Sequence, residues 1–121
     1  MNEVQRGEVY MVKPDPSNVG KEILKQRPCV VVSSSIVNIN AGIVVVCPIT
    51  EGVGVSASMI HVPLEKGEGG MKKDSIILCE QIKAVDDERI LEKTGNIRAE
   101  IMQQVDSALI AILNLHKKLA L

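Results

Sequence analysis

Aromatic residues are almost absent from this sequence of 121 residues, which contains one tyrosine, Tyr10, and no phenylalanine or tryptophan. Proteins that hold single-stranded nucleic acid by base stacking need several aromatic side chains on one surface. Stacking is therefore excluded as the main source of affinity for such a ligand. The core must be built from aliphatic residues, and the β-branched ones among them favour strands.

The chain also lacks an excess of charge of one sign. Its 14 lysines and arginines stand against 15 aspartates and glutamates, which gives a formal net charge of −1. Affinity for a polyphosphate depends on neutralising its phosphates with lysine and arginine. A histone-like binder is therefore excluded, and any phosphate site must be a local group of cations.

Membrane and metal signatures are missing as well. No hydrophobic run approaches the roughly 20 residues of a membrane span, and the first residues do not form a signal peptide. Neither His61 nor His116 has a second metal ligand at a useful spacing, and we interpret both as structural. Cofactor-binding motifs such as GxGxxG are absent. We therefore expect no membrane segment, no metal and no cofactor.

The three cysteines, Cys29, Cys47 and Cys79, are far apart and lie in or beside apolar runs. Their number is odd and no CxxC spacing occurs, so they are interpreted as reduced core thiols. Reduced thiols are typical of the cytoplasm, which is the expected location.

Length and composition predict one domain over residues 1–121. Proline interrupts strand pairing, so Pro48 is expected at a strand end or a bulge and Pro63 at a strand end. Residues 13–26 are predicted to form a loop. Alternating or continuous apolar runs predict five strands: residues 7–12, 29–32, 43–47, 59–62 and 74–82.

The last third of the chain has a helical pattern. Residues 86–94 begin with acids and are followed by Gly95, which predicts a short helix. Asn96 is expected to cap a second helix that extends to about Lys118. Its core-facing stripe would consist of Ile97, Ile101, Val105, Ala108, Ile112, Leu115 and Leu119. Strands followed by helices indicate the α+β class, with a small β-barrel or a strongly bent antiparallel sheet.

Further apolar residues, Leu109, Ile110, Ala111 and Leu113, widen this stripe beyond what a helix on one sheet needs. Two interpretations are open. The helix either lies in a groove of its own chain or also covers a second subunit.

Polar residues at the ends of the buried strands are candidates for chemistry. Arg27 directly precedes an apolar strand that holds its backbone, so its planar guanidinium can be aimed at a phosphate. Thr50 follows the next strand, and Glu22 lies in the loop before Arg27. Taken alone, each of these residues is better explained by an ordinary surface position.

Other charged residues carry less information. Arg6, Lys72 and Lys73 are interpreted as solvated surface charges.

The order of the segments is more specific than any one of them. The spacing of Gly20, Glu22 and the Arg27-Pro28 pair is the most specific part. The chain resembles the MazF/PemK family of toxin endoribonucleases in five segments: RGEVY at 6–10, GKE at 20–22, RPCVVVS at 27–33, VCPIT at 46–50 and DSIILCEQI at 74–82.

This resemblance implies a small SH3-like antiparallel β-barrel of the CcdB/MazF type with a C-terminal helix. It implies a homodimeric toxin, held inactive by a cognate antitoxin protein, that cleaves single-stranded RNA at specific sequences without a metal. The implied reaction is attack of a ribose 2′-hydroxyl on the adjacent phosphate, leaving a 2′,3′-cyclic phosphate and a 5′-hydroxyl.

By the same resemblance, Arg27 and Thr50 correspond to catalytic residues of the family and Glu22 to its loop acid. In-line attack builds negative charge on the non-bridging oxygens, which an arginine and a hydroxyl donor stabilise. A guanidinium has a pKa above about 12, so Arg27 is expected to stabilise charge first and to donate a proton second. Glu22 is the candidate base. The residues expected to contact RNA are Tyr10, Lys21, Lys25 and Gln81.

Two other functions stay open. A toxin of the same fold, like CcdB, would act on DNA gyrase through its surface and would not need Arg27 or Thr50. A catalytically weak family member would bind RNA without efficient cleavage. The bulky Ile23-Leu24-Lys25 segment after Glu22 departs from the usual family pattern of small residues.

Overall fold

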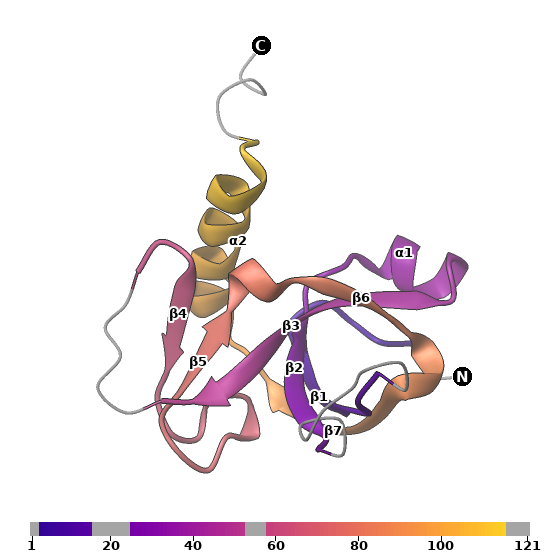
Figure 1. Cartoon of the computed structure of the whole chain (residues 1–121), viewed down its shortest axis with the longest axis horizontal. Coiled ribbons are helices and arrows are strands. Elements are labelled where there is room, and N and C mark those ends of the chain that lie inside the picture. The colour runs from indigo at the N-terminus through magenta and orange to yellow at the C-terminus, as the bar shows by residue number, and fades with distance from the viewer. Residues whose placement is uncertain (1–2, 16–24, 53–57, 116–121) are drawn as a thin grey trace.

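The computed structural model describes residues 3–15, 25–52 and 58–115. Seven strands form one sheet in the order β4-β5-β3-β2-β1-β7, and β6 pairs with β3 (Figure 1). The elements are β1 Glu8–Val12, β2 Arg27–Val31, α1 Ser35–Asn40, β3 Ile43–Glu51, β4 His61–Leu64, η2 Glu68–Gly70, β5 Ser75–Leu78, η3 Cys79–Gln81, β6 Lys83–Asp86, η4 Asp87–Arg89, β7 Ile90–Asn96 and α2 Ala99–Leu113.

Five strands curve into a barrel. Antiparallel pairing joins β6, β3, β2, β1 and β7 in that order, and the single turn of η4 leads from β6 directly into β7. The barrel encloses an aliphatic core of Val4, Val12, Cys29, Val31, Val44, Val46 and Val85. The expected α+β class with an SH3-like, barrel-type antiparallel sheet and a C-terminal helix is confirmed.

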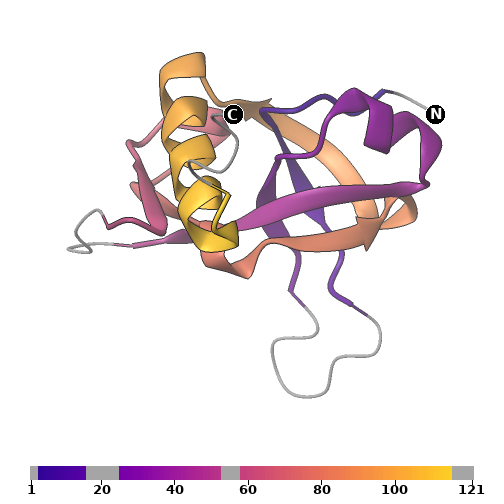
Figure 2. The same cartoon turned by 90° about the horizontal axis from the view of Figure 1, so that it is seen from above.

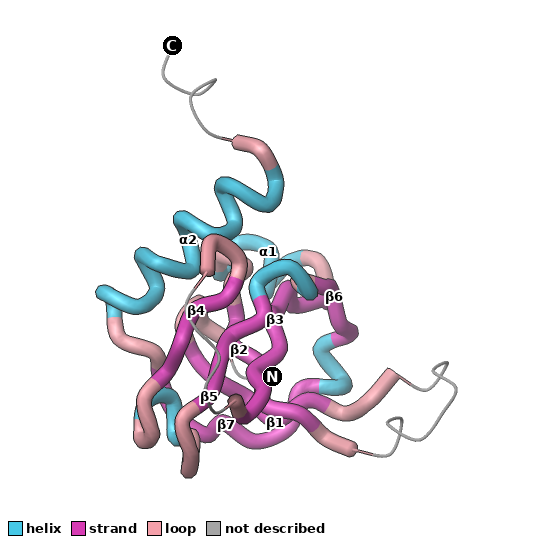
Figure 3. Tube along the Cα trace, turned by 60° about the vertical axis from the view of Figure 1, so that its left-hand side comes forward, coloured by secondary structure: helices cyan, strands magenta, loops and turns pink. Residues whose placement is uncertain are grey.

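A second core lies on the other side of β2 and β3, because alternate residues of a strand face opposite sides of the sheet. Val30 and Cys47 point into this second core, whereas Val31 and Val46 point into the barrel. The helix α2 covers the second core and packs on η3 and β4 (Figure 3). The short helix α1 lies on the opposite side of the molecule from α2 (Figure 2). β2 and β3 are therefore buried on both faces, as their continuous apolar runs predicted.

The helical stripe is confirmed for its central residues, since Ile101, Val105 and Ala108 are buried. The predicted cap is wrong: Arg98, not Asn96, is the N-cap, and α2 ends at Leu113. Asn114 adopts φ 58°, a left-handed conformation that asparagine tolerates better than most residues. Leu115 is 46% exposed, so its predicted core position is also wrong. No helix in the described part of the chain is long and apolar enough to cross a membrane.

Pro48, expected at a strand end or a bulge, and Pro63, expected at a strand end, both lie inside strands. Pro48 is opposite Cys29 in β2, and it stands where β3 changes its other neighbour from β6 to β5. Its missing N–H therefore costs no ladder hydrogen bond on that side. Pro63 pairs with Ile76 but belongs to β4, which is an edge strand. A proline is tolerated at an edge for the same reason.

The helix predicted over 86–94 is wrong, because residues 90–96 form β7 and pair with β1. That pairing satisfies the open edge of β1, and it outweighs the weak helix propensity of the segment. Gly95 does not end a helix. Its missing side chain lets its backbone lie close to the backbone of Gly69. A Cβ on Gly95 would lie 2.6 Å from the carbonyl carbon of Gly69.

One further local prediction was wrong, and one element was not predicted. The long strand predicted over 74–82 ends at Leu78, where η3 turns the chain toward β6. The short helix α1 was not foreseen, because its six residues include two exposed isoleucines, Ile36 and Ile39, without a helical apolar stripe. The three cysteines are buried and free, as predicted.

Candidate functional site

The pairing of β2 with β3 brings Arg27 and Thr50 together. Cys29 lies opposite Pro48, and the same antiparallel register continued by two residues puts Arg27 opposite Thr50 on one face. The Arg27 side chain is exposed and Thr50 is half-buried. The two strands, each buried on both faces, thus present a guanidinium and a hydroxyl side by side at the edge of the core.

Two neighbouring hollows share these residues. The basic hollow, with a volume of about 430 Å³, is lined by Lys25, Gln26, Arg27, Pro28, Ile49, Thr50, Glu51, Met71, Lys72 and Ser75. The Gln81 hollow, with a volume of about 350 Å³, is lined by Arg27, Pro48, Ile49, Thr50, Leu78, Gln81 and Lys83. Arg27 and Thr50 occur in both sets, so they stand on the ridge between two open spaces.

The charge around this ridge is positive although the whole chain has a formal charge of −1. Four cations, Lys25, Arg27, Lys72 and Lys83, line the two hollows, against the carboxylate Glu51. The guanidinium of Arg27 has no hydrogen bond or ion pair with another described residue. A planar fork of donors without an internal partner is available for an external phosphate or carboxylate.

The hydroxyl of Thr50 is also available. Its Oγ1 donates to the backbone oxygen of Glu51 at 3.5 Å, a long contact at the limit of hydrogen bonding. A phosphate oxygen in the hollow would be a better acceptor. The pair can therefore supply two kinds of donor, a charged fork and a neutral hydroxyl, to one anionic ligand.

The other predicted site residues differ in whether they lie near Arg27 and Thr50. Lys25 and Gln81 line hollows that contain Arg27 and Thr50. Glu22 and Lys21 lie outside the described residues. Tyr10 lines neither hollow.

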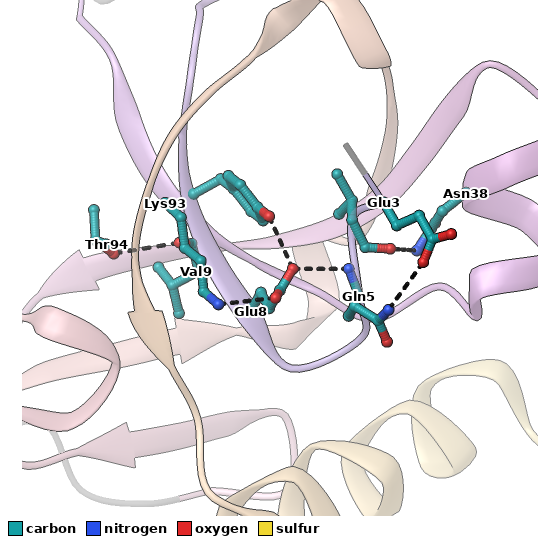
Figure 4. A network of polar contacts seen from close by, with 9 residues as sticks. Glu3, Gln5, Glu8, Val9, Asn38, Lys93 and Thr94 are labelled. Carbon is teal, nitrogen blue, oxygen red and sulfur yellow. Dashed lines mark hydrogen bonds and ion pairs between the residues drawn. The ribbon is translucent and has the colours of Figure 1, made fainter. Parts of the chain in front are cut away.

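Tyr10 belongs instead to a polar network on β1. Its hydroxyl donates to the Glu8 carboxylate at 2.8 Å. Burial and this hydrogen bond raise the pKa of Tyr10 to about 12. Burial by itself would raise the pKa of Glu8, but the ammonium of Lys93 at 2.9 Å, the N–H of Gln5 and the Tyr10 hydroxyl outweigh it and lower that pKa (Figure 4).

Two lysines of the site were not predicted. Lys72 was interpreted as a solvated charge, and Lys83 was not considered. Lys83 lies opposite Val46 in the pairing of β6 with β3. No local sequence signal marks either residue, because only the folding of β5 and β6 beside β3 brings them to the hollows.

Other charged groups have structural contacts. Arg6, also interpreted as solvated, donates to the backbone oxygen of Val32 at 3.0 Å and pairs with Asp106 of α2. His61 lies 3.3 Å from the Glu80 carboxylate. Within the part of the chain that the structure describes, no three metal-ligating side chains gather in a group.

Comparison with known proteins agrees with the barrel fold. The family model described as "PemK-like, MazF-like toxin of type II toxin-antitoxin system" matches residues 5–113. The chain belongs to this toxin family. A relative, the endoribonuclease MazF of Staphylococcus epidermidis, is 35% identical over 106 residues, which cover 88% of each chain.

Solved structures of toxins share the same fold. A MazE-MazF complex from Deinococcus radiodurans matches with a TM-score of 0.77 and 20% identity, covering 95% of this chain and 99% of that chain. An endoribonuclease in complex with its cognate antitoxin, from a mycobacterial species, matches with a TM-score of 0.76 and 18% identity, covering 94% and 98% of the two chains. With 18% and 20% identity, these two matches establish the fold of this chain.

Proposed function

We propose that this chain is the toxin endoribonuclease of a toxin–antitoxin system and that it cleaves single-stranded RNA at specific sequences by attack of a ribose 2′-hydroxyl. The observation that carries the proposal is the guanidinium of Arg27, which has no partner among the described residues, beside the hydroxyl of Thr50 in hollows lined by further cations. The 35% identity to an endoribonuclease over most of the chain supports the same activity.

In this mechanism the scissile phosphate lies between the two strand-end residues. Attack by the 2′-hydroxyl forms a bond to phosphorus and breaks the bond to the 5′-oxygen of the next nucleotide. Negative charge then grows on the non-bridging oxygens, and the Arg27 guanidinium stabilises it. Thr50 donates to the same phosphate and holds it in line. The products are a 2′,3′-cyclic phosphate and a 5′-hydroxyl, and no metal takes part.

Proton transfer is assigned to Glu22 as base, with Arg27 as a secondary proton donor. Lys25, Lys21 and Gln81 are proposed to bind the RNA chain on either side of the scissile phosphate. Tyr10 lies away from the hollows, so its predicted contact with RNA would require the ligand to reach the outer face of β1.

The active form is proposed to be a homodimer controlled by an antitoxin. Ile110, Leu113 and Leu115, near the end of α2, are 41%, 50% and 46% exposed. A second subunit would cover these residues, as expected for an apolar patch on a stable fold. Two similar solved structures are toxin–antitoxin complexes by their titles, which supports inhibition by a partner protein. The proposed location is the cytoplasm, where mRNA and reduced thiols occur together.

The test is cleavage of a mixed single-stranded RNA by purified protein in EDTA, followed by mapping of the new ends. We expect 5′-hydroxyl ends with the unaltered chain and a loss of roughly 10²- to 10³-fold in rate for Arg27→Ala and for Thr50→Ala. Arg98→Ala is the control, since Arg98 is an exposed arginine that lines neither hollow.

Three outcomes would contradict the proposal. Cleavage that survives Arg27→Ala would remove the proposed site. Toxic expression without cleavage in vitro would favour a surface toxin that acts on gyrase. RNA binding without cleavage would favour the catalytically weak alternative.

A further inference from the structure

A third, smaller cavity shares Arg27 with the two hollows. This Cys29 cavity has a volume of about 80 Å³ and is lined by Val12, Lys13, Pro14, Asp15, Lys25, Arg27, Cys29, Lys83 and Arg89. Its described lining residues thus include five cations and one carboxylate. Lys25 and Lys83 each also line one of the two hollows, so the three spaces form a continuous basic surface around Arg27.

The backbone at the Cys29 cavity is held in place. The N–H of Lys13 donates to the backbone oxygen of Arg89 at 2.9 Å. In return, Nε and Nη2 of Arg89 donate to the backbone oxygen of Lys13 at 3.0 Å and 2.8 Å. These three bonds join the end of β1 to η4. Lys13 therefore projects from a fixed backbone, which lowers the entropy lost when its ammonium group binds a ligand.

Five cations line this cavity together with Cys29. Cys29 is 1% exposed, and burial raises the pKa of its thiol to about 11, while Lys83, Arg89 and Arg27 act in the opposite direction. Three positive charges from β6, η4 and β2 are therefore close enough to act on the same sulfur atom. Like charges gathered at one place repel one another, and an anion bound among them would remove that repulsion.

The anion that the cavity fits is defined by the neighbouring site. An RNA chain that places one phosphate between Arg27 and Thr50 can place a neighbouring phosphate on the same basic surface. Lys13, Lys83 and Arg27 can donate to non-bridging oxygens without any base contact, so this recognition would not depend on RNA sequence. Their ammonium and guanidinium groups suit a phosphodiester, which has one full negative charge and acceptors only.

We propose that the Cys29 cavity is a second phosphate subsite, which binds a phosphodiester of the RNA chain flanking the one that is cleaved. This inference rests on the proposed function, since it assigns the scissile phosphate to Arg27 and Thr50. The subsite increases affinity for RNA and fixes the position of the chain, and it takes no part in the chemical step.

The test uses a fluorescent 2′-O-methyl RNA of mixed sequence, which cannot be cleaved because its 2′-oxygens are blocked. The variant Lys13→Gln changes one exposed side chain that lines the Cys29 cavity and neither hollow, and it keeps the backbone bonds of Lys13. We expect its affinity to fall roughly two- to fivefold for the lost ion pair at low salt. The slope of log K against log salt should become less steep by about 0.7, the value for one phosphate of a single strand.

Replacing the phosphates of the RNA one at a time shows which of them binds to the subsite. Methylphosphonate, which is neutral, replaces one phosphodiester at a time in an oligonucleotide built around the mapped cleavage sequence. With the unaltered chain, one flanking position should weaken binding in addition to the scissile one. With Lys13→Gln, the effect at that flanking position should become smaller while the effect at the scissile position stays, as in a double-mutant cycle. Lys66→Gln, an exposed lysine outside all three spaces, should change nothing.

The possible failures are distinguishable. If both proteins show the same profile of methylphosphonate effects, the subsite is overturned, although Arg27→Ala still abolishes cleavage and the proposed function stands. If inorganic phosphate shifts amide resonances of Lys13 and Lys83 but no flanking methylphosphonate matters, the cavity binds free anions and the RNA subsite is again overturned. If Arg27→Ala leaves cleavage intact, the proposed function itself fails.

Discussion

Two hollows of similar size on this molecule have opposite charge. The basic hollow, of about 430 Å³, carries Lys25, Arg27 and Lys72 against Glu51. The acidic hollow, of about 400 Å³, is lined by Gly52, Pro63, Leu64, Glu65, Glu68, Asp74, Ser75, Ile76, Arg98, Ile101 and Gln104, with three carboxylates against one arginine. The basic and the acidic hollow therefore cannot be distinguished by their volumes.

Their difference lies in what the charged groups already contact. In the acidic hollow, Glu68 accepts the N–H of Arg98 at 2.9 Å and Asp74 accepts the N–H of Lys66 at 2.9 Å. These carboxylates satisfy backbone donors at turns and at the start of α2. In the basic hollow, Arg27 has no such partner among the described residues. Two of the three carboxylates in the acidic hollow therefore stabilise the fold, whereas the arginine of the basic hollow is free for a ligand.

The largest expected effect tests whether the basic hollow needs the shape of its arginine as well as its charge. Arg27→Lys keeps the charge but loses the planar fork. We expect the cleavage rate to fall about 10- to 100-fold, which corresponds to one or two charged hydrogen bonds. The matched Arg98→Lys variant should stay within twofold in the same RNA cleavage assay. Equal losses in both variants would remove the distinction between the hollows.

The second prediction concerns the acidic hollow and the stability of the fold. Glu68→Ala removes the acceptor of the Arg98 N–H at the start of α2, so we expect the free energy of unfolding to fall by about 1 kcal/mol. Urea denaturation measures this change, and Glu65→Ala serves as the control because the structure gives its side chain no hydrogen bond within the described residues. RNA cleavage at a temperature where both variants are folded should be unchanged. A loss of cleavage with full stability would assign the acidic hollow a direct role.

A smaller effect is expected at Lys72, which lines the basic hollow. Lys72→Gln should weaken binding of an uncleavable RNA by roughly two- to fivefold at low salt, and the difference should shrink as salt is added. Fluorescence anisotropy measures the affinity, with Lys66→Gln as control. Equal affinities for the two variants would return Lys72 to the solvated surface charge that the sequence indicated.

The smallest change is expected at Tyr10, away from both hollows. Because Tyr10 is the only aromatic residue, its ionisation can be followed by ultraviolet absorbance without interference. The midpoint should lie near 12, since burial and Glu8 raise the pKa of Tyr10 to about 12 from 10. The folded state prefers the neutral phenol, so this contribution to stability is complete below pH 10 and is lost as the pH rises toward 12.

Two variants separate the regions in this titration. Glu8→Gln should lower the midpoint, because it removes the negative charge beside the phenol. Arg27→Gln should leave the midpoint unchanged. A shift with Arg27→Gln would show that the basic hollow and the outer face of β1 are electrostatically coupled.

Much of the fold followed from local patterns. The apolar runs at 29–32 and 43–47 predicted β2 and the first half of β3, and the spacing of Ile101, Val105 and Ala108 predicted the buried face of α2. Such patterns are reliable because burial on one or both faces leaves a periodic trace in the chain itself. The failures, Pro48 inside β3 and residues 90–96 as β7, concern which neighbour a strand pairs with. Pairing between segments that are distant in the sequence leaves no periodic pattern within either segment.

The residues of the candidate site also divide into those that the sequence predicted and those that it did not. Arg27 and Thr50 could be chosen from sequence because each stands at the end of an apolar run in a recognisable order of segments, whereas Lys72, Lys83 and Lys13 could not. An aliphatic core and locally grouped cations were already implied by the near absence of aromatic residues and by the balanced charge. Only the tertiary structure decided which cations gather, since the register of β2 on β3 and of β6 on β3 sets the distances between groups that are far apart in the chain.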